Sequence, residues 1–73
     1  MDEYSVVLFY SSSHALRAEK VLIRAGISNK MIPTPRQLSS DCGMSLRFDR
    51  ADEERVTRVL AEHQVPTNGI HAI

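Results

Sequence analysis

One non-periodic stretch, residues 33–43 (PTPRQLSSDCG), separates two regular halves of the chain and so limits the folds available to it. Pro33 and Pro35 fix φ and bias the residues before them towards extended backbone, which makes the stretch stiff. Ser39–Asp41 favour turns, because their side chains bond neighbouring backbone amides. A hairpin needs a connection of only about two to five residues, and longer loops are commonly functional. The stretch is therefore interpreted as a presented loop.

The half before the loop has the pattern of a strand, a helix and a strand. Residues 4–10 form a β-branched and aromatic run, typical of a central strand buried on both faces. The serines at 11–13 are candidate N-caps of a helix that runs to about Ala25, with Gly26 as its C-cap. A shorter strand over 27–32 ends at Pro33, which suits a sheet edge.

The half after the loop repeats this pattern. Residues 44–48 alternate, which predicts a strand with Ser45 and Arg47 on one face and three apolar residues on the other: Met44, Leu46 and Phe48. Asp49 is the expected N-cap of a second helix. The inner stripe of that helix is expected to be Val56, Val59, Leu60 and His63. A turn follows, and residues 70–73 form a short last strand.

The order β-α-β-β-α-β predicts an α+β, ferredoxin-like sandwich, a four-stranded sheet with two helices on one face. Right-handed crossovers place the first two strands parallel, with the third between them. The end of the first strand, the start of the first helix, the loop and the turn near Asn68 then share one edge, which brings His14 towards Cys42. Residues 1–73 are expected to form a single domain.

The sheet face without helices is expected to expose Val7 and Phe9 beside Arg47. An apolar patch of this kind on a small domain commonly marks an interface. The expectation is therefore a homodimer or a partner protein on this face.

The composition excludes several classes of function. Nine basic and nine acidic side chains cancel, which argues against a nucleic-acid partner. No apolar run approaches the ~20 residues of a membrane span, and the acidic start is unlike a signal peptide. The single cysteine cannot form an internal disulfide, so a cytoplasmic protein with a free thiol is expected. One cysteine and three dispersed histidines lack the spacing of a metal site, and no cofactor is expected.

Three segments, 12–19, 32–36 and 38–48, resemble the selenium/sulfur carrier protein-like family of small bacterial and archaeal domains. The resemblance extends over residues 3–73. It rests on His14 at the start of the helix, the Pro-Arg pair at 35–36, the Ser-x-x-Cys-Gly run at 39–43 and the Leu-Arg-Phe run at 46–48. The resemblance implies a thiol that accepts and hands on a chalcogen atom.

Cys42 is the candidate reactive residue. A thiolate is the active form, and nearby cations or a helix N-terminus stabilise it. It would carry sulfur or selenium as a persulfide or selenosulfide. His14 would deprotonate Cys42 or pair with it, and Arg36 would hold an anionic substrate or the carboxylate of a partner. The alternative for Cys42 is a buried structural cysteine.

Three further residues are assigned supporting roles. Ser40 is expected to brace the loop through local hydrogen bonds. Gly43 is expected to permit a backbone conformation closed to other residues and to allow close approach to Cys42. Arg47 is expected to line the uncovered sheet face. For Arg36 and Arg47 the alternative is a solvated charge or a weak surface ion pair.

The leading hypothesis is a small thiol carrier that relays sulfur or selenium between donor and acceptor proteins. A carrier is favoured over a turnover enzyme because no acid–base pair is evident apart from His14. The alternative is a non-catalytic regulatory or interaction module that binds a small anionic ligand or a partner protein.

Overall fold

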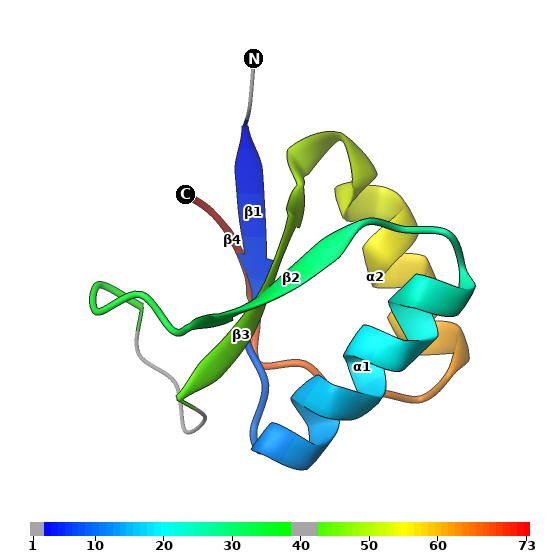
Figure 1. The fold of residues 1–73 in the computed structure, drawn as a ribbon, viewed down its shortest axis with the longest axis horizontal. Coiled ribbons are helices and arrows are strands. Elements are labelled where there is room, and N and C mark those ends of the chain that lie inside the picture. Colours follow the sequence, from blue (N-terminus) through cyan, green and yellow to red (C-terminus); the bar gives the residue numbers. More distant parts are fainter. Residues whose placement is uncertain (1–2, 39–42) are drawn as a thin grey trace.

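The computed structural model describes residues 3–38 and 43–73. Its elements are, in order, β1 (Tyr4–Val7), α1 (Ser12–Arg24), β2 (Asn29–Pro33), β3 (Met44–Asp49), the 3₁₀ turn η1 (Arg50–Asp52), α2 (Glu53–Glu62) and β4 (Ile70–Ala72). The strands form one sheet in the order β2-β3-β1-β4, and each neighbouring pair is antiparallel. Both helices cover the same face (Figure 1). The predicted α+β, ferredoxin-like sandwich is confirmed.

All four strands differ in their bounds from the prediction, and β1 and β2 differ most. The sheet ladder of β1 ends at Val7 instead of Tyr10, because the next residue, Leu8, bonds the turn before β4. The Leu8 amide donates to the carbonyl of Gly69 at 2.9 Å, and its carbonyl accepts from the Asn68 amide at 2.6 Å. β2 starts at Asn29 and ends at Pro33, and the strand order confirms that it is an edge strand.

Both helices end with the same pair of backbone hydrogen bonds. In α1 the amide of Gly26 donates to Ile23 at 3.0 Å, and the amide of Ile27 donates to Leu22 at 2.9 Å. These two bonds form a Schellman motif, in which Ala25 is the C-cap and Gly26 follows with a left-handed φ of 76°. The C-cap is therefore Ala25, and the predicted cap, Gly26, is the residue that follows it.

The start and inner face of α2 differ in detail from the prediction. Asp49 caps the short η1 turn, because its carboxylate accepts from the Ala51 amide at 2.9 Å. Val56 and Leu60 are buried as expected. His63 is exposed, and its inclusion in the inner stripe was wrong, because it is the C-cap, where the chain turns away from the core.

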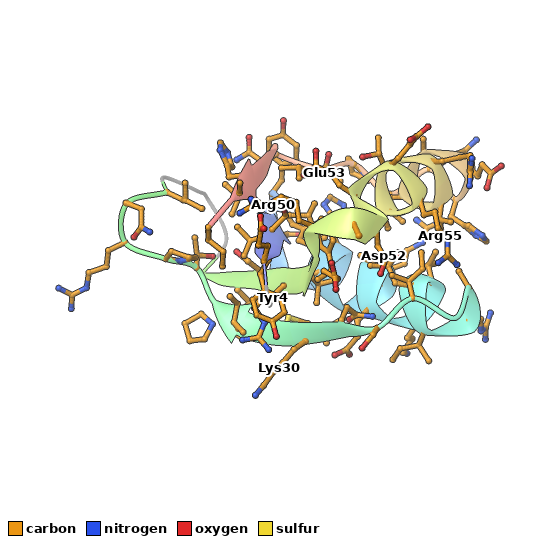
Figure 2. The ribbon with its side chains drawn as sticks, turned by 90° about the horizontal axis from the view of Figure 1, so that it is seen from above. Tyr4, Lys30, Arg50, Asp52, Glu53 and Arg55 are labelled. Atoms are coloured by element: carbon orange, nitrogen blue, oxygen red, sulfur yellow. The ribbon has the colours of Figure 1, made fainter. Side chains whose placement is uncertain are left out.

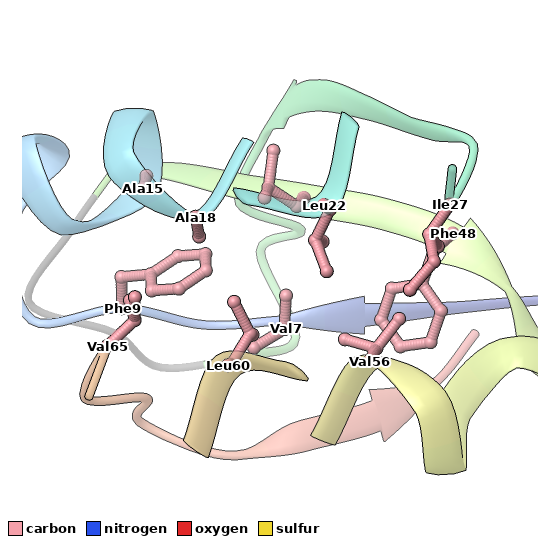
Figure 3. Close-up of a cluster of buried hydrophobic side chains, with 11 residues drawn as sticks. Val7, Phe9, Ala15, Ala18, Leu22, Ile27, Phe48, Val56, Leu60 and Val65 are labelled. Carbon is pink, nitrogen blue, oxygen red and sulfur yellow. The ribbon is translucent and has the colours of Figure 1, made fainter. Parts of the chain in front are cut away.

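The core lies between the helices and the sheet (Figure 3). It contains Val7 and Phe9, which are fully buried, so the prediction that they lie on the helix-free face was wrong. Val7 pairs directly with Leu46, and directly paired residues point to the same face. The helix-free face instead carries Tyr4 and Val6 from β1 and Leu8 directly after it, of which Val6 and Leu8 are also buried. The predicted homodimer interface therefore loses its stated basis.

Within the part of the chain that the structure describes, no helix has the length and apolar character of a membrane span.

Candidate functional site

The loop leaves the sheet from a closed base. The last paired residues of the hairpin are Pro33 and Met44, and the Thr34 amide then donates to the Gly43 carbonyl at 2.9 Å. The hydroxyls of Thr34 and the fully buried Ser45 lie 2.7 Å apart and share a hydrogen bond. These contacts fix the two ends of the loop, at Thr34 and at Gly43.

The first part of the loop is a tight turn. The Leu38 amide donates to the Pro35 carbonyl at 3.0 Å, which places Arg36 and Gln37 at the tip. Both tip residues are exposed. Among residues 3–38 and 43–73, no ion pair or side-chain hydrogen bond of Arg36 is found. The Arg36 guanidinium is thus accessible to an external anion.

The described neighbours of the loop lie at one end of the sheet. β1 and β3 are antiparallel, so the end of β1 and the start of β3 share an edge. The start of α1 lies at this same end, which is the lower end in Figure 1. Gly43, His14 and Asn68 are therefore on a common edge, as the chain directions predict. Cys42 and Ser40 lie outside the described residues.

His14 occupies the first turn of α1 and is half-buried. Its backbone amide donates to the Ser11 hydroxyl at 3.4 Å, which confirms a serine N-cap for this helix. The Nδ1 atom of its ring is buried, and no described residue forms a hydrogen bond with it. A buried polar atom without a partner is costly, so it requires an explanation in packing or in function.

The backbone conformation predicted for Gly43 stays a prediction, because its φ depends on Cys42, which lies outside the described residues. A Cβ atom built on Gly43 would meet nothing within 4 Å. The Gly43 carbonyl accepts from the Thr34 amide, so Gly43 extends the hairpin pairing beyond Met44.

Arg47 belongs to a different group of residues. It lies on the helix-free face as predicted, paired with Val6 and Lys30. Its guanidinium carbon lies 4.3 Å from the centre of the Tyr4 ring. The structure therefore groups Arg47 with Tyr4 and Lys30. Tyr4 and Lys30 were not among the predicted site residues, because only the strand register shows that they adjoin Arg47.

No group of three or more potential metal ligands is found among the described His, Asp and Glu side chains. Cys42 is not included in that search, so the result concerns the described part of the chain alone.

The fold and the braced loop define a class of protein: a small ferredoxin-like domain that presents a proline-bounded loop from one sheet edge. The family model described as "Putative Se/S carrier protein-like" matches residues 3–72. The chain belongs to this family. Neither the curated proteins nor the solved structures yielded a match.

Proposed function

We propose that this domain is a thiol carrier that receives a sulfur or selenium atom on Cys42 and passes it to an acceptor protein. Membership of the carrier-like family supports this role. The observation that carries the proposal is the braced loop base, where Thr34 holds Gly43, the residue directly after Cys42. A carried atom must be presented to two different partners, and a loop with a fixed base and an exposed first turn suits that task.

The transfer requires no external oxidant. The Cys42 thiolate attacks the outer sulfur of a donor persulfide, a new S–S bond forms on Cys42, and the donor cysteine leaves as a thiolate. An acceptor thiolate then attacks the outer sulfur of the Cys42 persulfide and releases Cys42 as a thiolate. The same exchange moves selenium through a selenosulfide. Since each step exchanges one bond for another, the carrier emerges unchanged.

His14 and Arg36 are assigned to the activation and docking steps. The buried Nδ1 atom of His14 has no partner among the described residues and is available to accept the thiol proton. Arg36, exposed at the tip of the turn, is available for a forked contact with a carboxylate of the partner. Ser40 braces the loop, and Gly43 serves as the fixed end of the loop.

A free thiol of this kind functions in a reducing compartment, so we place the protein in the cytoplasm. Its partners are then a donor of persulfide or selenosulfide and an acceptor protein with a reactive thiolate.

The test is the intact mass of the folded protein after incubation with cysteine and a desulfurase that generates persulfides. The expected product carries one or more added sulfur atoms, and a reductant removes them. The Cys42→Ser variant should fold and acquire no sulfur. If the folded wild-type protein acquires none under conditions that load a known carrier, the proposal is wrong.

A second measurement concerns the activation of the thiol. The rate of Cys42 alkylation at neutral pH should exceed that of a free thiol of pKa ~8.5. His14→Phe should slow alkylation and leave stability equal or higher, because it removes a buried nitrogen without a partner. Arg36→Ala should slow it as well, through loss of a cation on the same loop. His63→Phe, on an exposed residue of α2's C-cap, is the matched control. Equal rates in all four proteins would exclude the assigned roles.

A further inference from the structure

A second candidate site lies at the end of the sheet opposite the loop. A half-open cavity of about 480 Å³ is lined by Tyr4 at the start of β1, by Lys30 of β2 and by Arg47 and Asp49 at the end of β3. Asp52, next to the start of α2, also lines it. Figure 2 is viewed from this end. Tyr4 and Lys30 lie away from the helices, and Asp52 lies beside the helices. This cavity is separate from the loop, which leaves the other end of β3.

The two cations that line this cavity, Lys30 and Arg47, lie where their charges destabilise the fold. Lys30 and Arg47 are a directly opposed cross-strand pair. Like charges in this position repel and destabilise a sheet. Within the described chain, neither side chain has an ion pair or a side-chain hydrogen bond. An anion between the two would remove the repulsion and satisfy their donors.

The Tyr4 ring holds one of these cations in place. The Arg47 guanidinium lies over the ring at 4.3 Å from its centre, a favourable cation–π arrangement. A guanidinium stacked on a ring keeps its planar edge of N–H donors free, and that edge matches the two oxygens of a carboxylate. The stack therefore preorganises Arg47 for a carboxylate ligand.

The acidic residues of the cavity indicate which second group a bound ligand carries besides its carboxylate. The carboxylate of Asp49 accepts from the Ala51 amide at 2.9 Å, and that of Asp52 lies 3.5 Å from Arg55. Each carboxylate retains further lone pairs. Asn29 also lines the cavity. These acceptors oppose a multiply charged anion and favour a ligand that also carries a cationic donor.

We propose that this cavity binds a free α-amino acid. The carboxylate of the ligand lies between Lys30 and Arg47, and its ammonium group faces Asp49 and Asp52. Inorganic phosphate fits less well, since two carboxylates adjoin the position of its second charge. The site would give the domain a ligand-binding role that is independent of transfer at Cys42.

The test is a titration of the full-length Cys42→Ser variant, followed by backbone amide NMR shifts. This variant leaves the cavity intact and makes the result independent of the carrier proposal. The probes are each of the common α-amino acids, with acetate and inorganic phosphate as comparison ligands. Saturable shifts are expected at Asn29, Lys30 and the end of β3 with one or more amino acids. Absence of such shifts, or equal shifts with acetate or phosphate, would overturn the proposal.

Substitution of Lys30 separates an effect on ligand binding from an effect on folding, because affinity should fall while stability rises. Lys30→Gln should weaken amino-acid binding about tenfold or more, the effect of losing one charge-assisted hydrogen bond. The same change should raise the melting temperature of the ligand-free protein, because it removes the like-charge pair. Lys20→Gln, on an exposed residue of α1 outside the cavity, should alter neither property. Unchanged affinity in Lys30→Gln would overturn the assignment.

Discussion

Gln64 has a φ of 56°, which makes it the one described residue other than glycine with a positive φ. It follows the C-cap of α2, the position that Gly26 occupies after α1. The Schellman bonds are the same, since the Gln64 amide donates to Ala61 at 3.1 Å and the Val65 amide to Leu60 at 2.9 Å. The backbone of Gln64 is thus held in the left-handed conformation, which residues with a side chain disfavour.

Gln64→Gly should therefore stabilise the protein. The gain in folding free energy is expected to be about 0.5–1 kcal/mol, the left-handed penalty less the greater chain entropy of glycine. Gly26→Ala is the matched control and should lower stability, with a purely conformational cost, since an added Cβ meets nothing within 4 Å. Urea denaturation measures both variants. A loss of stability in Gln64→Gly would show that its side chain makes a contact that outweighs the strain.

At the scale of the elements, the two helices cap each other. Arg17 of α1 donates to the carbonyl of His63, the C-cap of α2, at 2.7 Å. Arg55 of α2 donates to the carbonyl of Ala25, the C-cap of α1, at 3.4 Å. Each arginine thus places a cation at the negative end of the other helix, where it satisfies a carbonyl that the helix leaves unpaired.

Removal of these arginines should loosen the packing of α1 against α2. Arg17→Ala is expected to cost about 1 kcal/mol of stability, and Arg55→Ala less, because its bond is longer. Arg58→Ala, an exposed arginine of α2, should change stability little. The midpoints of urea unfolding give the ranking. Equal midpoints for the three variants would show that the two contacts contribute nothing in solution.

The elements also show how far local sequence pattern can predict a structure. Periodicity and residue type together identify each helix and strand, and the alternation of residues 44–48 assigns the faces of β3 correctly. The run Val6–Phe9 has no alternation, so it carries no information on which side chains face the helices, and the assignment of Val7 and Phe9 failed.

The two candidate sites also differ in how far the sequence can predict them. The edge shared by His14 and Gly43 follows from chain direction, which the order of elements determines. The cavity at the opposite end depends on register, since a shift of one residue would turn Lys30 to the other face, away from Arg47. Tyr4 is a diagonal neighbour of Arg47, because it pairs with Asp49. No sequence pattern within one strand could indicate that group.

At the scale of the whole molecule, Arg50 links parts of the chain that are far apart in sequence. Its side chain pairs with Glu3 at 2.6 Å and donates to the carbonyls of Tyr4 at 3.4 Å and Ile73 at 3.1 Å. Its backbone amide donates to the Glu3 carbonyl at 3.0 Å. One residue of η1 therefore joins the start of β1 to the residue that follows β4.

Arg50→Ala should weaken this link without disturbing the core. The expected loss is about 1 kcal/mol, because the ion pair with Glu3 is half-exposed and contributes little beside the carbonyl bonds. The Ile73 amide, which donates to the Tyr4 carbonyl at 3.0 Å, should exchange its hydrogen faster, while amides of the core strand β3 change in line with global stability alone. Glu3→Gln, which removes the ion pair and keeps the carbonyl bonds, should have the smaller effect. If Glu3→Gln costs as much as Arg50→Ala, the ion pair holds the strands together and the carbonyl bonds do not.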